Sequence, residues 1–194
     1  MDTSFRIALG ALVVAILLVR TPPQLRSLET TERQRLESRW NIALRSVAGL
    51  VGIALLLAYL WKPRTIAWAA LPIPGAIRWL GVAIGVSGIA GLMWVHRELG
   101  RNFSGTLEVQ KDQVLVTSGP YHWVRHPMYT AMLLIVFSFF LVSANWLIGA
   151  VWIGSLAAVV MSRLRREDAA MEVRFGAQYR TWAAHTGRLL PRLR

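Results

Sequence analysis

Two polar segments of the chain carry the side chains that could bind a ligand or take part in a reaction. The first, residues 119–129, holds two histidines, an arginine and three aromatic side chains. Pro120 and Pro127 within it prevent one regular helix. The second, residues 163–168, holds three arginines, a glutamate and an aspartate. If the fold brings the two segments together, they could enclose an ionic ligand.

The second segment has helical spacing. Arg163 and Glu167 are four residues apart and would share one face of a helix. The same face continues through three less polar residues, Met171, Phe175 and Tyr179, which would lie against the rest of the protein. From position alone, a surface ion pair at the end of an apolar helix is the more frequent explanation for Arg163 and Glu167. Such a pair contributes little stability.

Metal and nucleophile chemistry have little support in these segments. His122 and His126 have the four-residue spacing of helical zinc sites. However, Pro127 follows directly, no glutamate lies between the histidines and no third ligand is evident, so we do not predict a metal. The chain has no cysteine, and neither Ser104 nor Ser118 stands in the sequence context of a serine nucleophile.

The elements that must position these segments are apolar. Of the 194 residues, 55% are hydrophobic and nine are tryptophan, more than a soluble domain of this length usually has. We predict a single all-α integral membrane domain, residues 1–194. Its five transmembrane helices would span residues 4–19, 42–61, 77–95, 128–142 and 146–162. The Gly81-x-x-x-Gly85 spacing in the third span predicts close helix packing.

The connections between the spans are of three kinds. Residues 24–40 are polar and predict a separate surface helix that begins after Pro22 and Pro23. The connection from the third to the fourth span alternates weakly at 106–109 and 113–117, which predicts a small hairpin or an extended clamp. The three residues 143–145 are so short a link that the fourth and fifth spans must form an antiparallel pair.

The charges predict the orientation of the chain. With five spans, 18 of the 22 Lys and Arg residues fall on one side of the membrane, and only Arg6, Lys62, Arg64 and Arg78 fall on the other. The positive-inside rule then places the N-terminus outside and the C-terminus in the cytoplasm. The net charge of +12 therefore fits anionic lipid, and no nucleic-acid-binding motif is present. Segments 119–129 and 163–194 would share the cytoplasmic side.

Taken together, the motifs resemble the isoprenylcysteine carboxyl methyltransferase family and its relatives among the phospholipid methyltransferases. The resemblance covers residues 103–194. The residues that carry it are Thr117-Ser118-Gly119-Pro120-Tyr121, Arg125-His126-Pro127-Met128-Tyr129, Arg163-x-x-x-Glu167-Asp168, Arg174-Phe175-Gly176-x-x-Tyr179 and the basic, proline-containing end 188–192. The combination at these distances is more specific than any one motif.

The resemblance implies methyl transfer from S-adenosylmethionine to the carboxylate of a prenylated cysteine or similar lipophilic acid, with S-adenosylhomocysteine as product. It implies a cytoplasmic-side cofactor site formed by the 103–129 loop and the C-terminal helix. Arg163 would bind the substrate carboxylate and Glu167 the cofactor, and both would be catalytic. The cofactor-binding residues would be Gln110, Gln113, Val114, Leu115, Val116, Tyr121, His126, Pro127, Met128, Tyr129 and Glu167. Asp168, where many relatives have a second glutamate, is assigned no direct role.

Three other functions remain open on the sequence. A phospholipid amine N-methyltransferase would use the same donor but would have to remove a proton from its nucleophile. A sterol-type membrane reductase would bind NADPH and usually has more than five spans. A small transporter or structural membrane protein is disfavoured because the polar residues cluster at one interface, whereas transport sites lie near the middle of the membrane.

Overall fold

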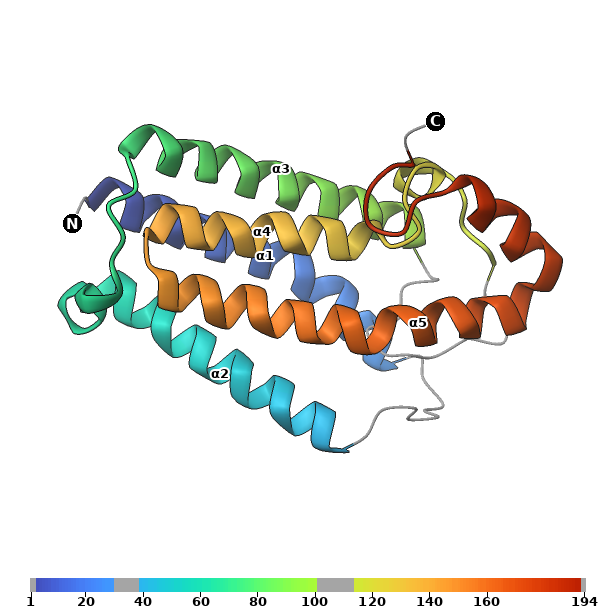
Figure 1. Ribbon diagram of the computed structural model, residues 1–194, viewed down its shortest axis with the longest axis horizontal. Coiled ribbons are helices and arrows are strands. Elements are labelled where there is room, and N and C mark those ends of the chain that lie inside the picture. The colour runs from blue at the N-terminus through green and yellow to red at the C-terminus, as the bar shows by residue number, and fades with distance from the viewer. Residues whose placement is uncertain (1–2, 30–38, 101–113, 193–194) are drawn as a thin grey trace.

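The protein is a bundle of five long α-helices, seen in a computed structural model that describes residues 3–29, 39–100 and 114–192 (Figure 1). Within the described ranges, two short 3-10 helices lie between them. In chain order the elements are α1 (Thr3–Glu29), α2 (Arg39–Trp61), η1 (Pro63–Ala69), α3 (Gly75–Leu99), η3 (Gly119–His122), α4 (Pro127–Ser143) and α5 (Trp146–His185). The predicted all-α class and the five long helices are confirmed.

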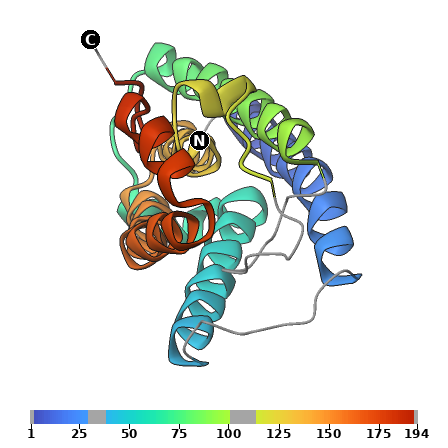
Figure 2. The ribbon, with the colours of Figure 1, turned by 90° about the vertical axis from the view of Figure 1, so that its right-hand side faces the viewer.

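Helix α4 lies at the centre of the bundle. It contacts α1, α3 and α5, while α2 packs mainly on α5 (Figures 1 and 2). The core is built from apolar side chains of all five helices, including the fully buried Leu9, Leu92, Ile135, Val142 and Ile148. The N-terminus lies at one end of the bundle. The end of α5, η3 and the C-terminal segment lie together at the opposite end (Figure 1).

Small residues on α3 allow its close approach to α4. A Cβ added at Gly81 would lie 2.6 Å from Cβ of Leu141, and one at Gly88 would lie 2.9 Å from Ile135. These distances are too short for real side chains, so a larger residue would push the helices apart. The helix-packing interpretation of the glycine spacing is therefore confirmed.

The tight link between α4 and α5 also follows the prediction. Ala144 adopts a left-handed conformation (φ 48°), and Asn145 then begins the turn into α5. The side-chain oxygen of Asn145 accepts hydrogen bonds from the amides of Leu147 and Ile148, and its nitrogen donates to the carbonyl of Ile66 at 2.9 Å. Asn145 thus caps the first turn of α5 and ties it to η1.

One local prediction was wrong. Helix α1 continues through Pro22 and Pro23 to Glu29, so no separate helix begins after the prolines. Proline φ is compatible with a helix. The prolines remove the amide donors for the carbonyls of Leu18 and Val19, and His96 of α3 donates to the Val19 carbonyl instead. Residues 114–117 form no strand, and 106–113 lie outside the described residues, so the hairpin or clamp expected at 106–117 stays a prediction. Within the described chain, β pairing is limited to the bridges Ala70–Asn145 and Val124–Gly187.

The helices suit a multi-pass membrane protein. Among the described residues, α1, α3 and α5 are long and apolar enough to cross a bilayer. Residues 46–61 of α2 and the following η1 pass the same test together but are bent by 112°. Helix α4 has 17 residues, a length of about 26 Å against a hydrocarbon core of about 30 Å. Five membrane crossings therefore remain a prediction.

Candidate functional site

A bend in α5 brings the C-terminal segment back over residues 119–129 (Figure 2). Gly176 has φ 52° and ψ −123°, a conformation that favours glycine because it lacks a Cβ. This is the glycine of the Phe-Gly-x-x-Tyr motif. Beyond it the chain reverses, and Tyr179 is buried against the bundle. The motif glycine therefore has a structural role, which is to turn the helix.

The returning segment is fastened to residues 121–130 by hydrogen bonds. The amides of Arg125 and His126 donate to the carbonyls of Gly187 (2.7 Å) and Arg188 (3.0 Å), and the amide of Gly187 donates back to the carbonyl of Trp123 at 3.2 Å. The indole of Trp182 donates to the carbonyl of Tyr121 at 3.2 Å. The two segments that the charge pattern placed on one side of the membrane therefore do meet.

Residues 121–130, Glu167 and Asp168 of α5 and the returning C-terminal segment meet in what we call the junction. His126 lies at its centre, between the two carboxylates. Its Nε2 is 2.9 Å from Oδ1 of Asp168, and its Nδ1 is 3.3 Å from Oε2 of Glu167. A neutral imidazole has only one N–H, whereas the imidazolium can donate to both carboxylates. Burial by itself lowers the pKa of His126, but the hydrogen bonds and charges of Asp168 and Glu167 raise it above the ordinary value. The two carboxylates therefore favour the protonated form of His126.

Two tyrosine hydroxyls donate hydrogen bonds to the carboxylates of Glu167 and Asp168. The hydroxyl of Tyr129 donates to Oε1 of Glu167 at 2.6 Å, and that of Tyr179 donates to Oδ1 of Asp168 at 2.5 Å. Burial, reinforced by Asp168, raises the pKa of Tyr179 well above its usual range. Both hydroxyls therefore stay protonated and act as donors at neutral pH. Glu167 is thus held from two sides on the face of α5 that was predicted for it.

Asp168 has more partners than any sequence argument suggested. Its Oδ2 lies 3.1 Å from Nε of Arg188 and 3.8 Å from Nη1 of Arg125, distances of an ion pair without hydrogen-bond alignment. Burial would raise the pKa of Asp168, but hydrogen bonds from His126 and Tyr179 and nearby positive charge lower it to about 2. The residue assigned no direct role is therefore the group that joins α4, α5 and the C-terminal segment.

A small cavity lies beside this junction. Its volume is about 50 Å³, and it is lined by Leu99, Val114, Val116, Tyr121, Arg125, His126, Met171, Tyr179 and Trp182. Four of these, Val114, Val116, Tyr121 and His126, were predicted to bind the cofactor. Tyr179 and Trp182 come from the segment beyond Gly176. The motif signalled Tyr179, but nothing in the sequence pointed to Trp182.

The other predicted cofactor residues lie around the cavity or outside the described chain. Leu115 is buried but does not line it, Pro127 begins α4, and Met128 packs against the hydrophobic core. Tyr129 and Glu167 are hydrogen-bonded to each other next to His126. Gln110 and Gln113 lie outside the described residues.

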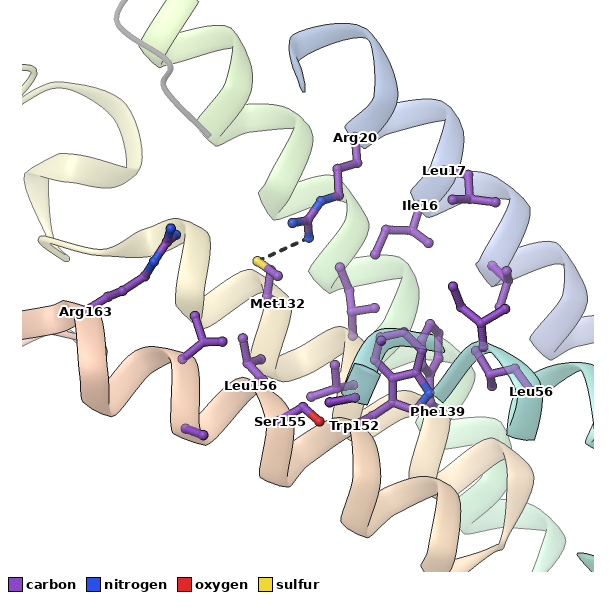
Figure 3. Close-up of a pocket in the computed structure, with 18 of the residues that line it drawn as sticks. Ile16, Leu17, Arg20, Leu56, Met132, Phe139, Trp152, Ser155, Leu156 and Arg163 are labelled. Carbon is purple, nitrogen blue, oxygen red and sulfur yellow. Dashed lines mark hydrogen bonds between the residues drawn. The ribbon is translucent and has the colours of Figure 1, made fainter. Parts of the chain in front are cut away.

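A second, larger cavity opens between α1, α2, α4 and α5 (Figure 3). Its volume is about 770 Å³, and most of its walls are apolar, with Ile16, Leu56, Ile135, Phe139, Trp152 and Leu156 among them. Three guanidinium groups line it as well, Arg20 of α1 and Arg163 and Arg166 of α5. Arg163, predicted to bind a carboxylate, therefore borders an apolar chamber. Arg20 and Arg166 were not predicted.

A series of contacting side chains in the junction links the wall of the large cavity to the wall of the small one. Arg163 borders the large cavity and lies close enough to Tyr129 to interact with its hydroxyl. Tyr129 donates to Glu167, which contacts His126, and His126 lines the small cavity. A ligand in the large cavity with an anionic group at Arg163 would thus lie next to whatever occupies the small cavity. The arrangement suits two reactants that enter from different directions.

Comparison with known proteins supports the family resemblance. The model of the isoprenylcysteine carboxyl methyltransferase (ICMT) family matches residues 80–173, just under half of the chain. A solved structure of the eukaryotic intramembrane Ras methyltransferase ICMT is similar, with a TM-score of 0.61 and 19% identity. The similarity covers 91% of this chain but only 60% of that protein, and it shows a shared fold. A search of curated proteins found no match. The predicted resemblance to the family is confirmed.

Proposed function

We propose that the chain acts as a member of the isoprenylcysteine carboxyl methyltransferase family. It would transfer a methyl group from S-adenosylmethionine to the carboxylate of a prenylated cysteine or a similar lipophilic acid. The observation that carries this proposal is that Arg163 lies at the wall of a large apolar cavity. Arg163 is also close to Tyr129, which donates a hydrogen bond to Glu167, and Glu167 contacts His126. An apolar chain and an acidic head group are the two parts that such a cavity would recognise.

The chemistry needs alignment more than acid–base groups. S-adenosylmethionine would supply a methyl group bonded to a positively charged sulfur. An acceptor carboxylate is already ionised at neutral pH, so one of its oxygens can attack the methyl carbon directly. As the new C–O bond forms, the C–S bond breaks, its electron pair stays on sulfur, and no proton moves. Arg163 would orient the carboxylate, and the apolar walls would exclude water from charges that cancel during the reaction.

The small cavity has groups suited to this donor. The Glu167 carboxylate next to it would balance the positive sulfur, and the aromatic faces of Tyr121 and Trp182 can contact a ring or a cation. Small-molecule sites usually have volumes of roughly 300 Å³ or more, well above the cavity's 50 Å³. Binding would therefore require Tyr179 and Trp182 to move away from Tyr121. Because both follow Gly176, they can move with the C-terminal segment.

The membrane arrangement that we propose keeps the predicted orientation. The N-terminus would lie outside, and the junction and C-terminal segment would lie on the cytoplasmic side. A soluble donor would enter from the cytoplasm. A lipophilic acceptor would enter from the bilayer between helices around the large cavity.

A phospholipid amine methyltransferase fits the large cavity less well. An amine that carries positive charge before it reacts would be repelled by Arg20, Arg163 and Arg166. His126 lines the small cavity and faces two carboxylates that favour its protonated form, so it is a poor group to take a proton from an amine. A carboxylate acceptor meets neither obstacle.

The experiment that tests the proposal is calorimetric titration of the purified full-length protein with S-adenosylhomocysteine. We expect binding to wild-type protein and its loss in Glu167→Ala. Glu172→Ala is a matched control, because Glu172 lies on the same helix with an exposed side chain. NADPH should not bind. Binding of NADPH instead of S-adenosylhomocysteine would support a reductase and overturn the methyltransferase proposal.

A further inference from the structure

Arg20 lies at the end of the apolar part of α1 and borders the large cavity. Its Nη1 is 3.7 Å from the sulfur of Met132 on α4 (Figure 3). A thioether is a weak acceptor for a guanidinium group. Among the residues whose side chains the structure describes, no carboxylate forms an ion pair with Arg20. Arg20 therefore offers hydrogen-bond donors to the cavity that the described protein uses only weakly.

Arg20 lies near the arginines of α5. In Figure 3, Arg20 and Arg163 lie on either side of Met132, and the two charges are close enough to repel each other. Arg166 lines the same cavity. The carboxylate of Glu167, also on α5, already accepts from Tyr129 and His126. Like charges grouped at an otherwise apolar surface are unfavourable, and an anion bound between them would relieve the repulsion.

We propose that Arg20 is a second acceptor-binding residue, which holds the acceptor carboxylate together with Arg163 while the apolar chain fills the cavity. The inference rests on the proposed function and deepens it. A carboxylate has about four lone-pair positions, so two guanidinium groups can bind it and still leave an oxygen free to attack the methyl carbon. Since Arg20 is on α1 and Arg163 on α5, the carboxylate would be fixed from opposite walls.

Two arginines at the carboxylate would let the site select acceptors that carry an acidic group. An acceptor with a neutral amide in place of the carboxylate keeps its apolar chain but loses the charge that both arginines recognise. Truncating one partner of a charged hydrogen bond weakens binding by about 10- to 100-fold. Arg20 should therefore separate the acid from the amide, whereas the apolar walls should bind both.

The test measures both analogues with full-length Arg20→Gln and wild-type protein. N-acetyl-S-farnesylcysteine serves as acceptor and its C-terminal amide as competitor. Arg20→Gln should raise the KM of the acid about 10- to 100-fold, leave inhibition by the amide within about twofold, and leave the Kd of S-adenosylhomocysteine unchanged. Arg20→Lys should recover part of the affinity, because it restores the charge without the planar fork. Arg165→Gln, an exposed arginine of α5 that does not line the cavity, is the matched control.

The outcomes separate this inference from the proposed function. An unchanged KM for the acid in Arg20→Gln overturns the inference, as does a parallel loss of amide binding, which would indicate a structural role. If wild-type protein transfers no methyl group, the proposed function fails. Direct binding of the acid and the amide to both proteins then decides the role of Arg20, since equal losses for both analogues would contradict it.

Discussion

Replacing Asp168 by asparagine should weaken the docking of the C-terminal segment on residues 123–130. Asparagine has nearly the same shape and can still accept the hydrogen bond from Tyr179. It removes the charge that faces His126 at 2.9 Å and Arg188 at 3.1 Å. Because the cations around Asp168 would stay partly buried, the variant loses attraction and leaves positive charge uncompensated.

The expected magnitude follows from exposure. The His126 side chain is only 10% exposed, so its charged hydrogen bond to Asp168 contributes about 1.5–3 kcal/mol. Arg188 is 52% exposed, and its ion pair contributes about 0–1 kcal/mol after screening by solvent. The His126 bond joins α4 to α5, and of these two contacts only the Arg188 pair reaches the returning segment, so we expect up to about 1 kcal/mol less stability for its docking, which is up to about fivefold more opening.

Hydrogen exchange measures this opening directly. The amides of Arg125, His126 and Gly187 report on the contact, because each donates a hydrogen bond between the two segments. Their exchange in Asp168→Asn should accelerate by the factor given above, while amides around the buried Leu92 of α3 should not change. Glu172→Gln, at an exposed position of the same helix, should leave all of them unchanged. Equal protection of the three reporter amides in wild type and Asp168→Asn would refute the reasoning.

Three further predictions concern the same junction. The raised pKa of His126 gives stability that is complete below its ordinary pKa of 6.5 and is lost as pH rises through the raised value. The difference in melting temperature between wild type and His126→Gln should therefore shrink as pH rises above 6.5. Gly176→Ala should destabilise docking of the segment by about 1–3 kcal/mol because of its positive φ, whereas Gly154→Ala, with open space around it, should be neutral or slightly stabilising in thermal unfolding. Tyr129→Phe removes a donor to Glu167 and should weaken S-adenosylhomocysteine binding about tenfold by calorimetry, since Glu167 becomes free to reorient; unchanged affinity would contradict this.

Much of the architecture could be predicted because it depends on local patterns. Apolar stretches predicted the five helices, and the glycine spacing of α3 predicted its close packing. The asymmetry of charge predicted that segments 119–129 and 163–194 lie at the same end of the bundle. The continuation of α1 past Pro22 and Pro23 could not be predicted, because local propensity favours a break there and does not forbid a helix.

The site was predictable only where a motif marked it. Glu167, His126 and Tyr129 belong to motifs, and the structure does bring them together. The partners of Asp168 depend on the turn at Gly176 and on the returning C-terminal segment, so its role required the geometry. Arg20 is separated from Arg163 by most of the chain, and no local pattern connects a residue of α1 to a cavity that four helices enclose.

The most direct test of carboxyl methyl transfer is to incubate the purified protein with methyl-labelled S-adenosylmethionine and three acceptors offered separately. The acceptors are N-acetyl-S-farnesylcysteine, its C-terminal amide, and phosphatidylethanolamine. We predict a base-labile methyl ester on the acid and no label on the other two. Label on the amine of phosphatidylethanolamine, or none on the acid while S-adenosylhomocysteine still binds, would contradict the account.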